Sequence, residues 1–166
     1  KVESVLYCTD SNDYQPDKLY GVYDWIHFDQ IAWYRKQSAH FASCNNGRPL
    51  PSLAFFHIPL LEYNELIGDG KTFGNDREGG VASSKVNSGI FASFLDRKDV
   101  MGVFAGHDHD NDYVGINKRI LLGYGRVTGA DAYGELIRGA RIIELYEGEF
   151  KFDTWIATLS GREAIY

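Results

Sequence analysis

The sequence predicts an α/β or α+β protein with a mixed sheet, and three observations lead to this fold class. Apolar residues recur at helical intervals over about residues 28–42, which predicts a helix early in the chain. Two continuous apolar runs, 52–58 and 100–105, are typical of strands buried on both faces. After residue 113 the pattern changes to short strand-like segments, which predicts a succession of strands late in the chain.

The first two elements are a strand and the early helix. Residues 2–7 alternate loosely between apolar and polar side chains and predict a strand, which turn-forming residues then end. The helix at about 28–42 has Asp29 near its start and the basic pair Arg35 and Lys36 further on. This order of charges suits the helix dipole and therefore supports the assignment.

The middle of the chain alternates buried strands with a loop and a short helix. The run 52–58 ends at Pro59, which cannot continue a central strand. Residues 68–87 are polar, glycine-rich and without periodicity, which predicts a long surface loop of the kind that is often functional. Helical spacing over 88–95 then leads into the second buried strand at 100–105.

The last third of the chain predicts β structure. Segments 113–116, 119–122, 140–145 and 150–156 have strand-like patterns, and the last two are joined by a turn at 147–149. With 166 residues the chain has the length of a single domain, long enough to bury a substantial core.

Composition and charge exclude several function classes. The net charge of −6, from 17 basic and 23 acidic residues, argues against nucleic-acid binding by counterion release. No apolar stretch is long enough for a membrane-spanning helix. A phosphate ligand would need a local cation to overcome the overall negative charge. For Cys8 and Cys44, one disulfide and two free buried thiols are both open, and we favour the free thiols.

Three histidines follow the buried strands. His57 lies near the end of the run 52–58, and His107 and His109 come directly after the run 100–105 and Gly106. The carboxyl ends of sheet strands are where α/β proteins collect ligands, and neutral imidazole is a common ligand for transition metals. A structural, hydrogen-bonded role is the alternative for each of them. For the pair His107 and His109 we favour metal binding.

Other motifs were tested and are weaker or absent. The acidic alternation that begins at Asp108 suggests a calcium loop, but such a loop needs Gly at its sixth position and Glu at its twelfth. Those positions are Tyr113 and Arg119, so an EF-hand is excluded. Gly123-Tyr124-Gly125-Arg126 approaches a phosphate-binding loop, but the signal is weak and a tight turn after a strand is the favoured interpretation.

The histidine segments together resemble the last two motifs of the calcineurin-like metallophosphoesterases. The similarity is greatest to the purple-acid-phosphatase-related branch that includes the Dcr2-type phosphatases, and it spans nearly the whole chain. The features that recur in this order are Tyr23-Asp24-Trp25-Ile26, Gln30, Phe56-His57-Ile58-Pro59-Leu60, Asn87-Ser88-Gly89, Gly102-Val103-Phe104-Ala105-Gly106-His107-Asp108-His109, Tyr124-Gly125-Arg126 and Arg138-Gly139-Ala140-Arg141.

The resemblance implies a site with two metal ions, Fe, Mn or Zn, bridged by the phosphate of a phosphoester substrate. It puts His57 and His107 on one metal and His109 on the other. Arg126 would contact the phosphate or the leaving group, or form a salt bridge within its turn. Asp108 and Asp110 would orient the imidazoles or be solvated acids of the loop.

The same resemblance implies that part of the domain is missing from this chain. The first three motifs of the family, Asp-x-His, Gly-Asp and Gly-Asn-His, supply the remaining ligands and are absent. Residues 1–166 are therefore expected to be the C-terminal part of one catalytic domain, the C-terminal half of an α-β-β-α sandwich. Three histidines without their carboxylates would bind no metal ion or only one, so we expect the chain alone to be inactive.

Three function hypotheses follow from the sequence. The first is metal-dependent phosphoester hydrolysis by the full-length protein, with phosphomonoesters as the favoured substrates. The second is a binding or structural module without catalysis, and the third is a hydrolase with one zinc held by His57, His107 and His109. The incomplete domain also predicts an exposed apolar edge, through which the chain would form a homodimer or aggregate.

Overall fold

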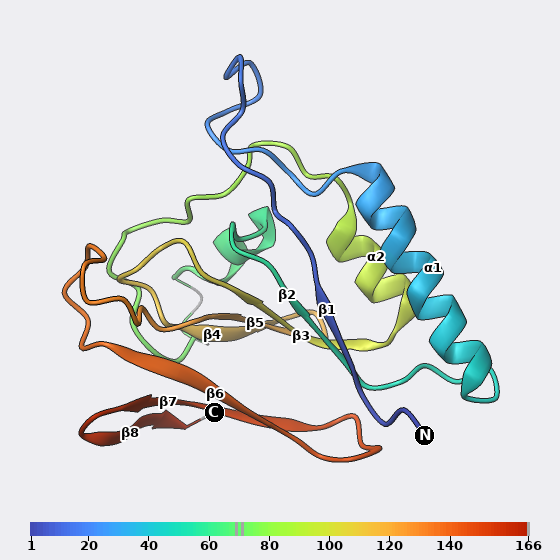
Figure 1. Ribbon diagram of the computed structural model, residues 1–166. Coiled ribbons are helices and arrows are strands. Elements are labelled where there is room, and N and C mark those ends of the chain that lie inside the picture. Colours follow the sequence, from blue (N-terminus) through green and yellow to red (C-terminus); the bar gives the residue numbers. More distant parts are fainter. Residues whose placement is uncertain (69, 71, 166) are drawn as a thin grey trace.

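A five-stranded mixed sheet forms the centre of the computed structural model, which describes residues 1–68, 70 and 72–165 (Figure 1). The strand order is β1-β2-β3-β5-β4; the first four in this order run parallel, and β4 pairs antiparallel with β5 at one edge. The strands are β1 Val5–Cys8, β2 Ser52–Phe55, β3 Val100–Ala105, β4 Val114–Asn117 and β5 Ile120–Tyr124.

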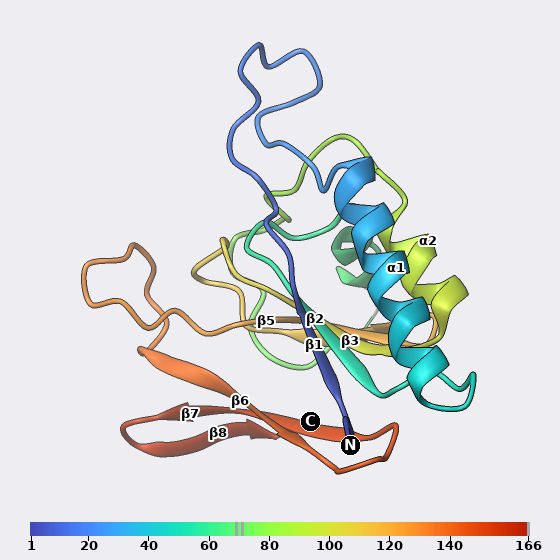
Figure 2. The same cartoon turned by 45° about the vertical axis from the view of Figure 1, so that its right-hand side comes forward.

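Two helices cover one face of this sheet. They are α1, Phe28–Cys44, and α2, Ile90–Arg97, which lie side by side in Figures 1 and 2. The hydroxyls of Tyr7 on β1 and Tyr34 on α1 both donate to the carboxylate of Asp99, which is 2% exposed. Because a buried carboxylate is costly without partners, this shared acid fixes the helix layer on the sheet.

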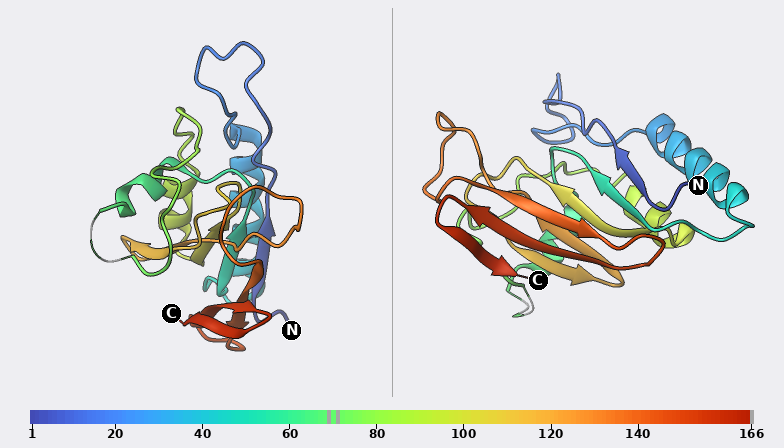
Figure 3. Two further views of the ribbon diagram at one scale, coloured as in Figure 1. Left: turned by 90° about the vertical axis from the view of Figure 1, so that its left-hand side faces the viewer. Right: turned by 60° about the horizontal axis from the view of Figure 1, so that its bottom comes forward.

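A three-stranded antiparallel sheet packs on the opposite face (Figure 3). Its strands are β6 Gly139–Leu145, β7 Phe152–Thr158 and β8 Gly161–Ile165. Gly102 on β3 faces Phe152 on β7, and an ideal Cβ at Gly102 would lie 2.8 Å from that ring. The absence of a side chain at this position therefore lets the two sheets approach closely. The layers are helices, mixed sheet and antiparallel sheet.

The predicted fold class, α/β with a mixed sheet, is confirmed by this arrangement. The second buried strand has the predicted bounds, and the early helix runs two residues past the predicted 28–42. The run 52–58 forms a strand only as far as Phe55, since the chain beyond it turns into the loop that carries His57. The sequence did not predict β8 or the 3₁₀ helix η1, Leu61–Leu66.

The two cysteines are free, as we favoured, but the prediction that they are buried is wrong. Cys8 and Cys44 are both exposed. Cys8 alternates with the buried side chains of β1 at the edge of the sheet, and Cys44 is the last residue of α1. Within the described ranges, no helix has both the length and the apolar character needed to cross a membrane.

Candidate metal and phosphate site

His57 and His107 meet beyond the carboxyl ends of two neighbouring parallel strands. The strands β2 and β3 pair up to Phe55 and Phe104, so the residues just beyond them emerge together. Nε2 of His57 lies 3.1 Å from Nδ1 of His107, and the Gly106 N–H donates to the His57 carbonyl. The strand register thus places two imidazoles side by side at this edge of the sheet.

The backbone of His107 is in an unusual conformation. Its φ is +76°, in the left-handed region that costs an L-residue with a Cβ about 1–2 kcal/mol. Strain of this kind concentrates at functional sites because the surrounding structure must enforce it. Partial burial lowers the pKa of the His107 imidazole, against the opposing effect of Asp108, and this favours the neutral form that binds metals.

His109 has a different set of contacts. Its Nδ1 lies 3.1 Å from the carbonyl oxygen of Tyr133, and the two rings stack with centroids 4.0 Å apart. Among the residues that the structure describes, no hydrogen bond links His109 to His57 or His107. The structure therefore brings two of the three predicted ligands together and holds the third against a separate loop.

The histidine pair matches part of what a metal ion requires. Two nitrogens bound to one tetrahedral zinc ion, each at about 2.0–2.1 Å, are about 3.3 Å apart. The 3.1 Å between the His57 and His107 nitrogens is close to this spacing. In the described part of the chain, however, no three His, Cys, Asp or Glu side chains are grouped in a way that could hold a metal ion. The nitrogens of His57 and His107 can occupy two coordination positions of one metal ion. The remaining ligands would have to come from groups outside this pair.

Three of the acidic and amide residues of the same segment face inward. Asp108, Asn111 and Asp112 are 5%, 1% and 1% exposed. Asp108 accepts hydrogen bonds from the Tyr124 hydroxyl and the Ala82 N–H, and burial raises the pKa of its carboxyl. The expectation that Asp108 is a solvated acid is therefore wrong, since its hydrogen-bond partners lie in the core and in another loop. That Asp108 orients an imidazole stays a prediction.

Asp110 also holds a loop and not an imidazole. Its Oδ1 accepts hydrogen bonds from the N–H groups of Glu135 and Leu136, at 2.6 and 2.9 Å. These bonds lower the pKa of the Asp110 carboxyl, because they stabilise its charged form. Neither of the two roles expected for Asp110, orienting an imidazole or simple solvation, matches these contacts.

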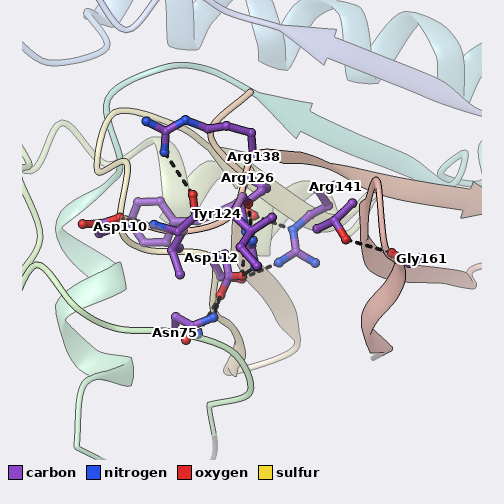
Figure 4. Close-up of polar contacts among 11 residues, drawn as sticks. Asn75, Asp110, Asp112, Tyr124, Arg126, Arg138, Arg141 and Gly161 are labelled. Atoms are coloured by element: carbon purple, nitrogen blue, oxygen red, sulfur yellow. Dashed lines mark hydrogen bonds and ion pairs between the residues drawn. The ribbon is translucent and has the colours of Figure 1, made fainter. Parts of the chain in front are cut away.

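Arg126 forms a buried ion pair with Asp112 (Figure 4). Its Nη2 is 2.6 Å from Oδ2 of Asp112, and the two side chains are 2% and 1% exposed. A further guanidinium nitrogen donates to the Ile137 carbonyl. The sequence left two roles open for Arg126, a phosphate contact and a salt bridge within its own turn. The structure contains a salt bridge, but its partner Asp112 lies outside that turn. The phosphate contact stays a prediction.

The other arginines of the recurrent segments bind backbone carbonyls (Figure 4). Arg138 donates to the carbonyls of Gly129 and Gly134, which closes the loop between β5 and β6. Arg141 donates to the carbonyls of Tyr124 and Asp112 and so ties the antiparallel sheet to the mixed sheet. These arginines build the loops around the histidines.

A cleft of about 530 Å³ lies between the two sheets and includes His57 in its wall. Phe55, Phe104 and Ile143 supply apolar parts of the lining. Arg126 and Thr128 contribute polar groups. The cleft therefore combines an apolar interior with one candidate metal ligand.

Comparison with known proteins gives a consistent result. The chain is 37% identical to the protein named probable inactive purple acid phosphatase 29 of Arabidopsis thaliana, over 93% of this chain and 42% of that protein. It is 38% identical to probable inactive purple acid phosphatase 28 of the same plant, over 90% of this chain and 38% of that protein. The chain is a homologue of purple acid phosphatase-like proteins. No family model matches it.

A yeast protein extends this relationship. The chain is 36% identical to phosphatase DCR2 of Saccharomyces cerevisiae, over 90% of this chain and 28% of that protein. The resemblance to the purple-acid-phosphatase-related, Dcr2-type branch is thereby confirmed. The chain spans less than half the length of each of these purple acid phosphatase-like relatives and of DCR2.

Two tyrosines next to the histidines were missed by the sequence analysis as site residues. Tyr23 packs edge-on against His107 with ring centroids 4.6 Å apart, and Tyr133 stacks on His109. Tyr23 lies within one of the recurrent segments and could have been singled out. Tyr133 lies in a loop 24 residues beyond His109, and no local pattern connects the two.

Proposed function

We propose that the full-length protein is a metal-dependent phosphoesterase that favours phosphomonoesters, and that this chain is the C-terminal part of its catalytic domain. The contact between His57 and His107 carries the proposal, since it places two metal-binding nitrogens 3.1 Å apart at the carboxyl ends of parallel strands. The share of the relatives' length that the chain matches, 28% to 42%, supports a larger whole.

We propose that the full-length protein binds two metal ions, Fe, Mn or Zn, and its purple acid phosphatase-like homologues support a two-metal family. When bound, such ions act as Lewis acids that neutralise and polarise the phosphoryl group. In this chain His57 and His107 would hold one ion and His109 the other. The lowered pKa of His107 keeps its imidazole neutral near pH 7, the form in which it can bind.

The chain alone is expected to have little or no turnover. In the described part of the chain, no group of three His, Cys, Asp or Glu side chains could hold a metal ion, and hard metal ions need carboxylate oxygens in addition to histidines. The test is hydrolysis of p-nitrophenyl phosphate by the purified chain with Mn, Fe or Zn added. Turnover that disappears in His107→Ala would contradict the claim of inactivity.

The longer protein should behave differently. We expect metal-dependent turnover that falls at least about 100-fold in His57→Ala and His107→Ala, because a lost ligand removes the ion it holds. Asp96→Ala is the matched control, since its carboxylate pairs with Arg35 on the exposed helix layer. Equal activity in all three variants would contradict the proposal.

A non-catalytic binding module is the second candidate. Its support is that two of the relatives carry names of probable inactive phosphatases. Metal analysis of the longer protein separates the two functions: a module without catalysis would purify without two ions and would not turn over substrate. A single-zinc hydrolase would need His109 beside the other two histidines, and its contact with Tyr133 gives that candidate less support.

The edge of the mixed sheet supports the proposal of a larger domain. β1 is an edge strand, and Leu6 on it is 55% exposed. An uncovered edge strand pairs readily with another chain, so the isolated chain is expected to form a homodimer. Light scattering should show a dimer that dissociates in Leu6→Lys; a monomeric wild-type chain would contradict this expectation.

A further inference from the structure

The loop between β5 and β6 carries a tyrosine with four separate contacts to the histidine segment. The Tyr133 ring stacks on the His109 ring, with 18° between the planes. The Tyr133 carbonyl lies 3.1 Å from His109 Nδ1. Its hydroxyl accepts from the His109 N–H at 3.2 Å and donates to the His107 carbonyl at 3.1 Å. One residue thus contacts both the ring of His109 and the backbone on either side of Asp108.

The contact to the carbonyl decides where the proton of the imidazole lies. A backbone carbonyl oxygen only accepts hydrogen bonds, so Nδ1 of His109 must be the donor. In a neutral imidazole with its proton on Nδ1, Nε2 carries the free lone pair. Histidines that bind metals commonly donate their other N–H to a carbonyl in this way, and the bond fixes the orientation of the ring.

The loop that presents Tyr133 is held from both sides. Asp110, next to His109, accepts from the two N–H groups that follow Gly134. Arg138 donates to the carbonyls of Ala132 and Gly134, on either side of Tyr133. Tyr133 is 56% exposed, so these polar contacts and not burial hold it in place.

Gly134 allows this close approach. Its φ is +104°, and an ideal Cβ there would lie 2.7 Å from Oδ1 of Asp110 and 3.3 Å from Cβ of His109. A side chain would therefore move the loop away from the histidine segment, and with it the Tyr133 carbonyl.

We infer that Tyr133 is a positioning residue that holds the His109 ring with its proton on Nδ1, so that Nε2 is available to a metal ion. The inference rests on the proposed function for the role of that nitrogen. The contacts themselves are independent of it. Tyr133 belongs to none of the recurrent segments and acts through His109.

Nitrogen NMR of the labelled chain at about pH 8 tests this directly, since it distinguishes the two tautomers of a neutral imidazole. The wild-type spectrum should show the proton of His109 on Nδ1. Tyr133→Phe should keep this tautomer, because the ring and the carbonyl remain. Gly134→Ala should shift the population toward Nε2–H, because it displaces the carbonyl. Tyr146→Phe, at a tyrosine whose hydroxyl donates to Asp153, is the control.

A zinc titration of the same variants, made in the longer protein, provides the second readout. Gly134→Ala and Tyr133→Ala should weaken zinc binding about tenfold or more, the usual cost of losing a group that orients a metal-binding histidine. Tyr133→Phe should stay near the wild-type affinity. A wild-type His109 with its proton on Nε2, or an unchanged tautomer in Gly134→Ala, would overturn the inference. An Nδ1–H tautomer in the wild-type chain, together with a longer protein that binds no zinc, would support the inference and count against the proposed function.

Discussion

Two sets of side chains in one short segment, Gly106 to Asp112, have opposite roles. His107 and His109 are partly exposed. The His107 ring packs edge-on against Tyr23, and the His109 ring stacks on Tyr133. Asp108, Asn111 and Asp112 are almost fully buried and bind other loops through hydrogen bonds. The histidines are positioned by a framework that the neighbouring residues build.

The difference shows that charge alone does not indicate which residues meet a ligand. A run of acids beside histidines suggests metal ligands, but here the acids satisfy backbone N–H groups and one guanidinium. Buried polar groups need such partners, and loops without regular structure supply many unpaired N–H groups. Substitutions of the buried residues Asp108, Asn111 and Asp112 should therefore lower the stability of the protein. Substitutions of the histidines should instead weaken metal binding.

The largest effect is expected from the buried ion pair. Asp112→Ala leaves the guanidinium of Arg126 without its carboxylate and should lower the free energy of unfolding by about 3–5 kcal/mol. Asp96→Ala removes a carboxylate from an exposed pair and should cost less than about 1 kcal/mol. Urea denaturation followed by circular dichroism measures both. Similar losses for the two variants would show that Asp112 is not part of the framework.

A smaller effect is expected at the amide that holds the long loop. The Asn111 side chain accepts from the N–H groups of Arg77 and Glu78, so Asn111→Ala should free this stretch. Losing such bonds costs about 1–3 kcal/mol, which should speed trypsin cleavage after Arg77 about tenfold. Asn64→Ala, which removes an exposed amide contact, should leave the rate unchanged. An unchanged rate in Asn111→Ala would contradict the role given to Asn111.

The smallest effect concerns the backbone of His107. Because its φ is +76°, His107→Gly should be more stable than His107→Ala by about 1 kcal/mol. Both variants remove the imidazole, so the difference isolates the conformational strain. Thermal unfolding measures it. Equal stability of the two variants would mean that the backbone at His107 is not strained.

Local patterns predicted the regular elements well. The apolar run 100–105 forms β3 with the same bounds, and the helical spacing from residue 28 forms α1. Each pattern reflects which residues of that one element are buried, so a short stretch of the sequence is enough to recognise the element. β8 was missed because Gly161–Ile165 has little apolar alternation and forms a strand through its pairing with β7.

The candidate site was predicted only in part. His57 and His107 could be placed together because the ends of parallel strands meet, which is a general property of such sheets. The inward positions of Asp108 and Asp112 depend on Tyr124 and Arg126, which come from another strand and the loop after it. The contact of Tyr133 with His109 depends on how a loop folds back, and the sequence near either residue contains no sign of it.

The most direct test of the central claim is a zinc titration of the chain by calorimetry, comparing His57→Ala, His107→Ala and His40→Ala. His40 is the control because it lies near Cys44 on α1, with Nε2 and Sγ 3.9 Å apart, and offers zinc a competing surface pair. The account predicts that loss of His57 or of His107 weakens zinc binding at least about tenfold, and that loss of His40 leaves it unchanged. Binding that depends on His40 and not on His57 or His107 would contradict it.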